Sequence, residues 1–134
     1  MKLRLKGNSL RLRVTRSELA RLQAGQPIEE AVLFPANAVL FPANKDARLS
    51  YVLQVGSHSQ PVHVAFASQQ IVVSVSPDQL ASWSDEHQVG IYASLAVDES
   101  TNLEVAIEKD FACLDLSDED NKDTFANPLA GKAC

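Results

Sequence analysis

Residues 2–14 read KLRLKGNSLRLRV, and this stretch decides how the first part of the chain folds. Leucine or valine alternates with lysine, arginine or serine on both sides of Gly7-Asn8, which is typical of strands with one buried face. A Gly-Asn pair between two such runs predicts a two-residue hairpin turn. In the resulting register Arg4 lies opposite Arg11. We therefore predict an antiparallel hairpin that has a leucine face and a basic face.

The basic face of this hairpin requires anions nearby, because like charges directly opposite each other destabilise a strand pair. The chain has 12 Lys and Arg against 17 Asp and Glu, a formal net charge of -5, but the two signs are separated. Seven of the basic residues lie within residues 1–22, whereas acidic residues are concentrated within residues 98–123. The last predicted strand begins at Leu103 and carries Glu104 and Glu108 on the face opposite its apolar residues.

We expect the first and last strands to be neighbours, or to face each other across the interior of a barrel. The candidate site then consists of charged residues from both strands, namely Arg4, Arg11, Arg13, Glu104 and Glu108. In a barrel interior they would form a charged cavity suited to an anionic ligand, by analogy with phosphate-handling barrels. The alternating glutamates near the N-terminus that mark such barrels are absent. Two alternatives stay open: the charges neutralise one another structurally, or both faces are solvated and far apart.

The remainder of the chain predicts further short strands and two short helices. Residues 15–18 (TRSE) form a capping-box pattern, and residues 76–77 (SP) are a second helix start. Strands are expected at residues 28–34, 48–55, 62–66, 71–75 and 89–97, and from residue 103 to as far as residue 111. This order predicts a mainly β (α+β) fold, an antiparallel small barrel or curved sheet with two short helices. We expect one antiparallel β domain over residues 1–114 and an acidic C-terminal tail over residues 115–134.

Residues 31–37 and 38–44 both read AVLFPAN, a tandem duplication. Seven is odd, so one strand running through both copies would turn the second copy's apolar side chains to the wrong face. Pro35 and Pro42 also interrupt a continuous central strand. We expect one copy to occupy a strand while the other bulges, loops out or forms an extra edge. An exposed apolar edge over residues 31–44 would support a homo-oligomer; the alternative is a tolerated surface insertion.

No catalytic motif stands out, and we expect no metal and no cofactor. Cys113 and Cys134 lack metal-ligand spacing and, without a signal peptide, are expected to be free thiols in a reducing, cytoplasmic compartment. The reactivity of Cys113 is left open. Residues 115–123 are acidic but lack the glycine that an EF-hand loop has at its sixth position. No apolar run approaches the ~18 residues of a membrane span.

The two ends of the chain resemble a family of short uncharacterised bacterial proteins, a domain of unknown function. The motifs are GNSLRLR at residues 7–13 and EKDFACL at residues 108–114, followed by Glu-Asp at 119–120 and FANP at 125–128. The resemblance spans nearly the whole chain and implies that these positions belong to the family pattern. It implies no activity. The doubled AVLFPAN segment departs from the pattern, which is expected to hold one copy.

These observations favour a small binding or interaction module that is not catalytic. The alternative is an enzyme or binder acting on an anionic (phosphorylated) small molecule in a charged barrel interior, so the question of enzyme activity stays open. Nucleic-acid binding through the hairpin would require a basic face that acids do not oppose, and the net negative charge argues against it. The expected partners are an anionic small molecule and a second copy of the chain, with no membrane partner.

Overall fold

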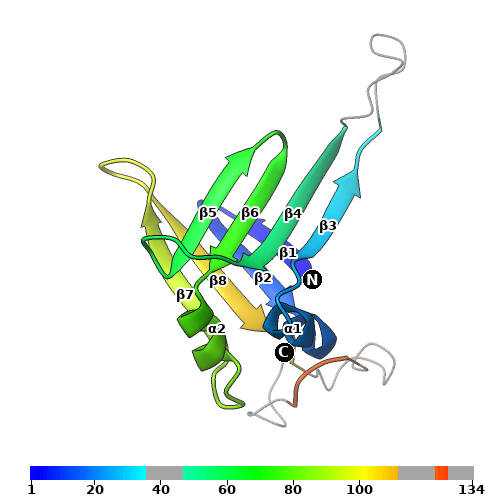
Figure 1. Cartoon of the computed structure of the whole chain (residues 1–134). Coiled ribbons are helices and arrows are strands. Elements are labelled where there is room, and N and C mark those ends of the chain that lie inside the picture. The colour runs from blue at the N-terminus through cyan, green and yellow to red at the C-terminus, as the bar shows by residue number, and fades with distance from the viewer. Residues whose placement is uncertain (36–46, 112–122, 127–134) are drawn as a thin grey trace.

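The computed structural model describes residues 1–35, 47–111 and 123–126, which form eight strands and two helices (Figure 1). In chain order the elements are β1 (Lys2–Lys6), β2 (Ser9–Val14), α1 (Arg16–Gln23), β3 (Ile28–Leu33), β4 (Arg48–Val55), β5 (Val62–Ala67), β6 (Gln70–Val75), α2 (Pro77–Trp83), β7 (Gly90–Ala96) and β8 (Asn102–Lys109). The mainly β class with two short helices is therefore confirmed. Neither α1 nor α2 has the length and apolar character that a helical membrane crossing needs.

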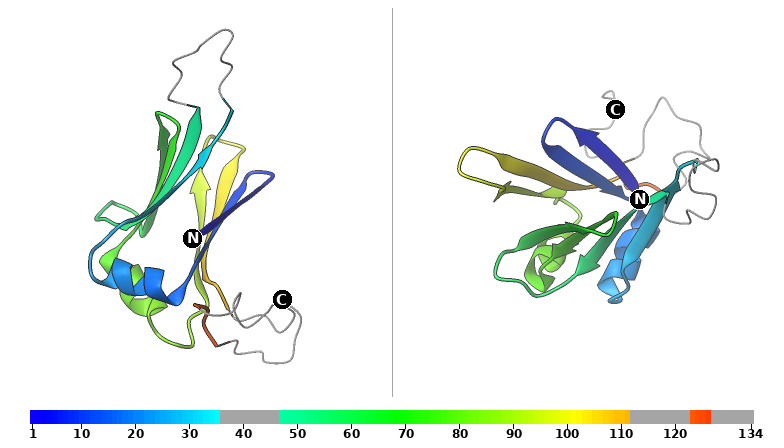
Figure 2. Two further views of the ribbon diagram at one scale, coloured as in Figure 1. Left: turned by 90° about the vertical axis from the view of Figure 1, so that its right-hand side faces the viewer. Right: turned by 90° about the horizontal axis from the view of Figure 1, so that it is seen from above.

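The strands form two four-stranded sheets, ordered β1-β2-β8-β7 and β3-β4-β6-β5. Each sheet joins two antiparallel hairpins through a parallel central pair, β2 with β8 and β4 with β6. The sheets lie face to face, with both helices at one end and the hairpin turns splayed apart at the other (Figure 2). The described strands close no barrel, so the curved-sheet form of the prediction is the one observed.

The fold repeats a unit of hairpin, helix and hairpin. β1, β2 and α1 correspond in order to β5, β6 and α2, and the hairpin β3–β4 corresponds to β7–β8. The residues correspond as well: Thr15 and Ser76 cap the two helices, and Leu22 and Trp83 are buried at the same helical position. Each unit contributes one hairpin to each sheet. Neither unit can therefore complete a sheet by itself.

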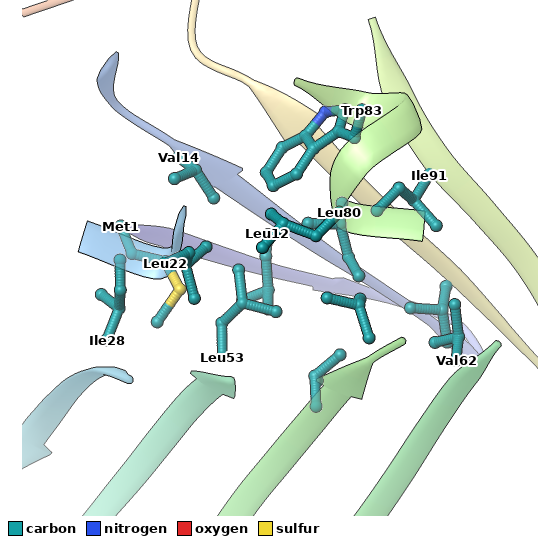
Figure 3. Close-up of a cluster of buried hydrophobic side chains, with 14 of the residues drawn as sticks. Met1, Leu12, Val14, Leu22, Ile28, Leu53, Val62, Leu80, Trp83 and Ile91 are labelled. Atoms are coloured by element: carbon teal, nitrogen blue, oxygen red, sulfur yellow. The ribbon is translucent and has the colours of Figure 1, made fainter. Parts of the chain in front are cut away.

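The core lies between the inner faces of the two sheets and is apolar. Its least exposed side chains come from both repeated units: Leu12, Val14, Leu22, Ile28, Leu53, Val73, Val75, Trp83 and Ile107. Figure 3 shows this cluster, with Met1 and Val62 on opposite sides of it. Because alternation sends every second side chain inward, these residues account for the leucine and valine pattern of the sequence. The charged side chains that alternate with them on β2 and β8, such as Arg11, Arg13 and Glu108, must then point outward.

The amino group of Met1 closes one side of the sandwich. Its nitrogen lies 2.6 Å from Glu18 Oε2 on α1 and 2.7 Å from Glu30 Oε1 on β3. Glu18 also completes the predicted capping box, because its Oε1 accepts a 2.9 Å hydrogen bond from the Thr15 amide. The Tyr51 hydroxyl donates to Glu30 Oε2 at 3.4 Å. These contacts tie β1 of one sheet to β3 of the other through α1.

The ionic groups of this cluster hold each other in their charged forms. Burial favours the neutral amine of Met1, but the hydrogen bonds and charges of Glu18 and Glu30 outweigh it and raise the pKa of the ammonium above its ordinary value of 8.0. Burial likewise works to raise the pKa of Glu18, but hydrogen bonds from the ammonium and Thr15 lower it below 4.5.

The first copy of the duplicated segment lies partly in β3. Ala31–Leu33 form the end of that strand, and Leu33 and Phe34 are exposed. The second copy, residues 38–44, lies outside the described residues. Pairing between chains through residues 31–44 stays a prediction.

Part of the predicted C-terminal tail packs against the domain. Asp123 accepts a 3.1 Å hydrogen bond from the Ser17 amide at the start of α1, and the Phe125 amide donates to the Asp110 carbonyl at 2.9 Å. Cys113, Cys134 and the rest of the acidic segment lie outside the described residues.

We predict that Glu18→Gln lowers the free energy of unfolding by about 3 kcal/mol, because the substitution leaves the buried ammonium with one carboxylate. The raised pKa of Met1 contributes stability that is present below pH 8.0 and is lost as pH rises through the folded-state pKa. The lowered pKa of Glu18 contributes stability that is present above pH 4.5 and is lost as pH falls through its folded-state pKa. Urea unfolding as a function of pH measures both losses of stability, the one at high pH and the one at low pH.

The matched control is Glu99→Gln, which removes an exposed carboxylate from the turn before β8. It should leave the pH dependence of the free energy of unfolding as in the parent protein. Equal losses in the two variants would show that the Met1 cluster does not stabilise the fold.

Candidate functional site

Seven charged side chains of β1, β2 and β8 share the outer face of the sheet β1-β2-β8-β7, which we call the charged face. Its members are Lys2, Arg4, Lys6, Arg11, Arg13, Glu104 and Glu108. The prediction that the two ends of the chain meet is confirmed, because Ser9 pairs with Glu104 and Arg13 pairs with Glu108. The predicted position in a barrel interior is wrong, since the inner faces of both sheets carry the apolar core.

Glu108 lies at the centre of the polar contacts on the charged face. Its Oε1 is 3.0 Å from Arg11 Nε, and its Oε2 accepts a 2.8 Å hydrogen bond from the Tyr92 hydroxyl on β7. The ion pair is not aligned as a hydrogen bond, so the buried Oε1 accepts none from the described residues. Burial, followed by the hydrogen bond to Glu108, raises the pKa of Tyr92 to about 12. The phenol is therefore a hydrogen-bond donor at neutral pH.

A shallow, open groove of about 470 Å³ lies over Ala106 of β8. The small side chain of Ala106 forms the floor, with Arg11 of β2 paired on one side and Tyr92 of β7 on the other. Glu104 and Ser94 line the part nearer the hairpin turns, where the Ser94 hydroxyl donates to Glu104 Oε1 at 2.8 Å. The groove thus combines a cation, a carboxylate and three hydroxyl groups, those of Ser9, Tyr92 and Ser94.

Two of the predicted site arginines, Arg4 and Arg13, make no ion pair within residues 1–35, 47–111 and 123–126. Arg4 lies directly opposite Arg11, and Arg13 lies directly opposite Lys2. Lys2 Nζ is 3.1 Å from Asp110 Oδ2, which offsets the second like-charge pair. The Arg4 side of the first pair has no such offset from the described residues.

The outer face of the other sheet shows that the fold does not need these charges. The internal repeat maps the seven positions of the charged face onto His63, Ala65, Ala67, Val72, Ser74, Ser50 and Gln54. Ala65 and Val72 form the pair equivalent to Arg4 and Arg11. The same ladder is thus built without a lysine, arginine or carboxylate at any of these positions. The fold therefore forms without the charges of the charged face.

Gly90 allows the close approach on which the Tyr92–Glu108 contact depends. Gly90 pairs with Glu108 across β7 and β8, and a Cβ atom there would lie 2.8 Å from the Ile107 carbonyl oxygen. It would also lie 3.0 Å from Glu108 Cγ and 3.0 Å from the Tyr92 hydroxyl oxygen. Any larger residue would therefore displace the backbone of β8 or these two side chains.

The remaining titratable groups form local contacts. Among the described residues, no three His, Cys, Asp or Glu side chains are grouped as metal ligands. The rings of His58 and His63 stack with centroids 4.1 Å apart, and Lys109 Nζ donates to the Asp85 carbonyl at 2.7 Å. Burial lowers the pKa of Lys109.

Sequence reasoning missed Tyr92, Ser94 and Ala106. Alternation in residues 89–97 does place Tyr92 and Ser94 on one face, opposite Ile91 and Leu95. Alternation does not tell which strand lies next to that one. The repeated cap and helix pattern, TRSELARL at residues 15–22 and SPDQLASW at residues 76–83, is the signal that could have revealed the internal repeat.

A family model described as a family of unknown function (DUF7009) matches residues 1–129. The matched range includes all the described residues, and it confirms the resemblance that the two ends of the chain indicated. No curated protein and no solved structure matches the chain.

We predict that Glu108→Gln lowers the pKa of Tyr92 from about 12 toward its ordinary value of 10.0, because a neutral amide stabilises the protonated phenol less. The pKa should stay above 10.0, since burial is its largest cause. Tyrosinate absorbance after a rapid pH jump, read before the protein unfolds, measures the shift. Ser94→Ala is the control and should leave the Tyr92 titration in place; an unchanged pKa in Glu108→Gln would contradict the assigned contact.

We predict that Gly90→Ala lowers the free energy of unfolding by about 1–3 kcal/mol, the usual cost of overpacking. Gly56→Ala is the matched control, because the nearest atom to a Cβ there is His58 Nε2 at 3.4 Å, on a side chain that can move. Urea denaturation of both variants tests this, and equal midpoints would show that β7 and β8 tolerate the extra carbon.

Proposed function

The chain belongs to the DUF7009 family, a family of unknown function, and we propose that it is a non-catalytic binding module that takes up an anionic group on its charged face. The observation that carries this proposal is the cross-strand pair Arg4–Arg11. Like charges in that position cost stability. The equivalent pair Ala65–Val72 supports the view that the charges serve a ligand and not the ladder.

The anion would lie beside Arg4 and reach Arg11 and Arg13. Guanidinium groups suit this role, because their planar set of N–H donors matches the oxygens of phosphate or carboxylate. Arg11 is already held by Glu108 at 3.0 Å, so its position is fixed before a ligand arrives. Such pre-organisation reduces the entropy lost on binding.

The rest of the ligand would extend over Ala106 into the groove. There the Tyr92 hydroxyl and the Ser94 hydroxyl are donors committed to carboxylates, at 2.8 Å each. Glu104 and Glu108 would repel a second anionic group at that end. The arrangement therefore favours a small molecule with a single anionic end and an uncharged or cationic remainder.

The openness of the site supports binding without catalysis. Electrostatic catalysis is most effective where water is excluded, and this groove is shallow and open. An enzyme acting on a phosphorylated small molecule is the alternative and differs in one measurable respect, which is turnover. Nucleic-acid binding is disfavoured, because Glu104 and Glu108 lie on the strand next to the basic ones.

We predict that inorganic phosphate binds to the charged face and that Arg4→Gln weakens it about threefold to tenfold, the effect of removing one of several charge contacts. The same variant should have a free energy of unfolding about 0.5 kcal/mol higher, because the like-charge pair is gone. Titration followed through the arginine Nε–H resonances measures affinity and location together. Arg21→Gln on α1 removes the same charge elsewhere and should leave the affinity for phosphate unchanged.

Equal weakening by Arg4→Gln and Arg21→Gln would reduce the binding to a general charge effect and contradict the proposal. p-Nitrophenyl phosphate separates module from enzyme: we expect it to bind without release of p-nitrophenol. Release that Arg4→Gln abolishes would favour the enzyme.

A further inference from the structure

The two sides of the sandwich differ in a way that the internal repeat makes visible. On the β1 and β3 side, the ammonium of Met1 sits between Glu18 and Glu30. The equivalent positions on the β5 and β7 side are Val62, Gln79 and Ala93. These three residues line a groove of about 240 Å³ between the two edge strands. One side of the molecule is thus closed by ion pairs and the other is open.

The backbone of β7 is unpaired along that open side. The Val97 amide donates to the Thr101 carbonyl, and the Lys109 amide donates to the Val89 carbonyl. Since hydrogen-bonded pairs alternate along an antiparallel ladder, the odd-numbered residues of β7 face β8. The amides and carbonyls of Tyr92, Ser94 and Ala96 therefore point away from the sheet, and no described strand pairs with them.

The composition of β7 also leaves this edge unprotected. Natural edge strands are commonly guarded by charged residues, as β1 is here by Lys2, Arg4 and Lys6. The sequence of β7 is GIYASLA, with no charged residue and no proline. Its equivalent in the repeat, β3, carries Glu29 and Glu30. The absence of guarding residues is therefore specific to this side.

The two faces beside β7 differ in chemistry. On the inner face, a neighbouring strand would direct its side chains toward Val62, Ala93 and Leu95, where small or apolar side chains leave the groove open. On the outer face, it would run beside Tyr92 and Ser94, whose hydroxyls donate to Glu108 and Glu104. Apolar side chains fit the first environment and basic side chains fit the second.

We propose that the free edge of β7 binds an extended segment of a partner protein, in which apolar residues alternate with basic residues, as an additional strand. Main-chain hydrogen bonds to Tyr92, Ser94 and Ala96 supply the affinity, and the groove at Ala93 selects the apolar side chains. The carboxylates of Glu104 and Glu108 select the basic ones. The anion beside Arg4 would lie at the other edge of this sheet, two strands away from β7, although the groove over Ala106 adjoins both sites through Tyr92 and Ser94.

The probe is a short capped peptide of alternating valine and lysine, compared with one of alternating valine and glutamate. We expect the lysine peptide to slow hydrogen exchange of the Tyr92, Ser94 and Ala96 amides about tenfold, with no comparable change at β5, and the glutamate peptide to bind at least tenfold more weakly. Ser94→Pro removes an outward amide that β8 does not use, and it should abolish binding. Ser94→Ala removes the hydroxyl but keeps that amide, so it should weaken binding far less than Ser94→Pro does.

A second variant keeps the test decisive if proline disturbs the strand. Ala93→Leu fills the groove without touching the backbone and should weaken the lysine peptide at least tenfold, while unfolding at an unchanged urea midpoint. Binding that survives both substitutions, protection that appears at β5, or no binding of the lysine peptide would each overturn the proposal. A self-associated protein that Ser94→Pro disperses would replace the partner with a second copy and would overturn it as well.

Discussion

The parallel pairing of β2 with β8 is the constraint on which the rest of the structure depends. It joins the first hairpin of the chain to the last one, with Leu12 beside Ile107 at the centre of the core. The equivalent pair, β4 with β6, joins the two middle hairpins. Because each repeated unit gives one hairpin to each sheet, the core cannot be buried by half of the chain. Stability and the charged face therefore both require the two ends to meet.

Contacts at the C-terminal end of β8 join residues from the two ends of the chain. Arg11 meets Glu108 on the outer face, and the Asp110 amide donates to the Val14 carbonyl where the two strands end. The Phe125 amide then donates to the Asp110 carbonyl at 2.9 Å. Residues near both ends of the matched family range thus contribute to one ladder and its continuation.

Local sequence patterns predicted well which face of each strand is buried, but predicted poorly which strands pair. The register of β1 and β2 was predictable because alternation and a Gly-Asn turn fix it from within a short segment. The proximity of β2 and β8 was predictable from their opposite charges. The parallel direction of that pair, and the pair β4–β6 altogether, were not predictable, because hydrogen bonding between distant strands leaves no periodicity in either strand. The barrel interior proposed for Arg4 and Glu104 failed for the same reason: a polar face can point into a barrel or out of a sandwich, and only the packing of the second sheet decides. Tyr92 was missed because its partner, Glu108, lies on another strand.

The two outer faces show where the repeated units diverged. Their inner faces kept matching apolar residues, such as Leu12 with Val73 and Leu53 with Ile107, because both must fill one core. The outer faces do not fill the core, so their residues can differ. One outer face is charged, while the other holds residues such as Ala65 and Val72. The like-charge pair Arg4–Arg11 carries a cost in stability, and the equivalent pair Ala65–Val72 shows that the ladder forms without it. Such a cost is typical of residues that serve binding, which supports the proposal of an anion site on the β1-β2-β8-β7 sheet.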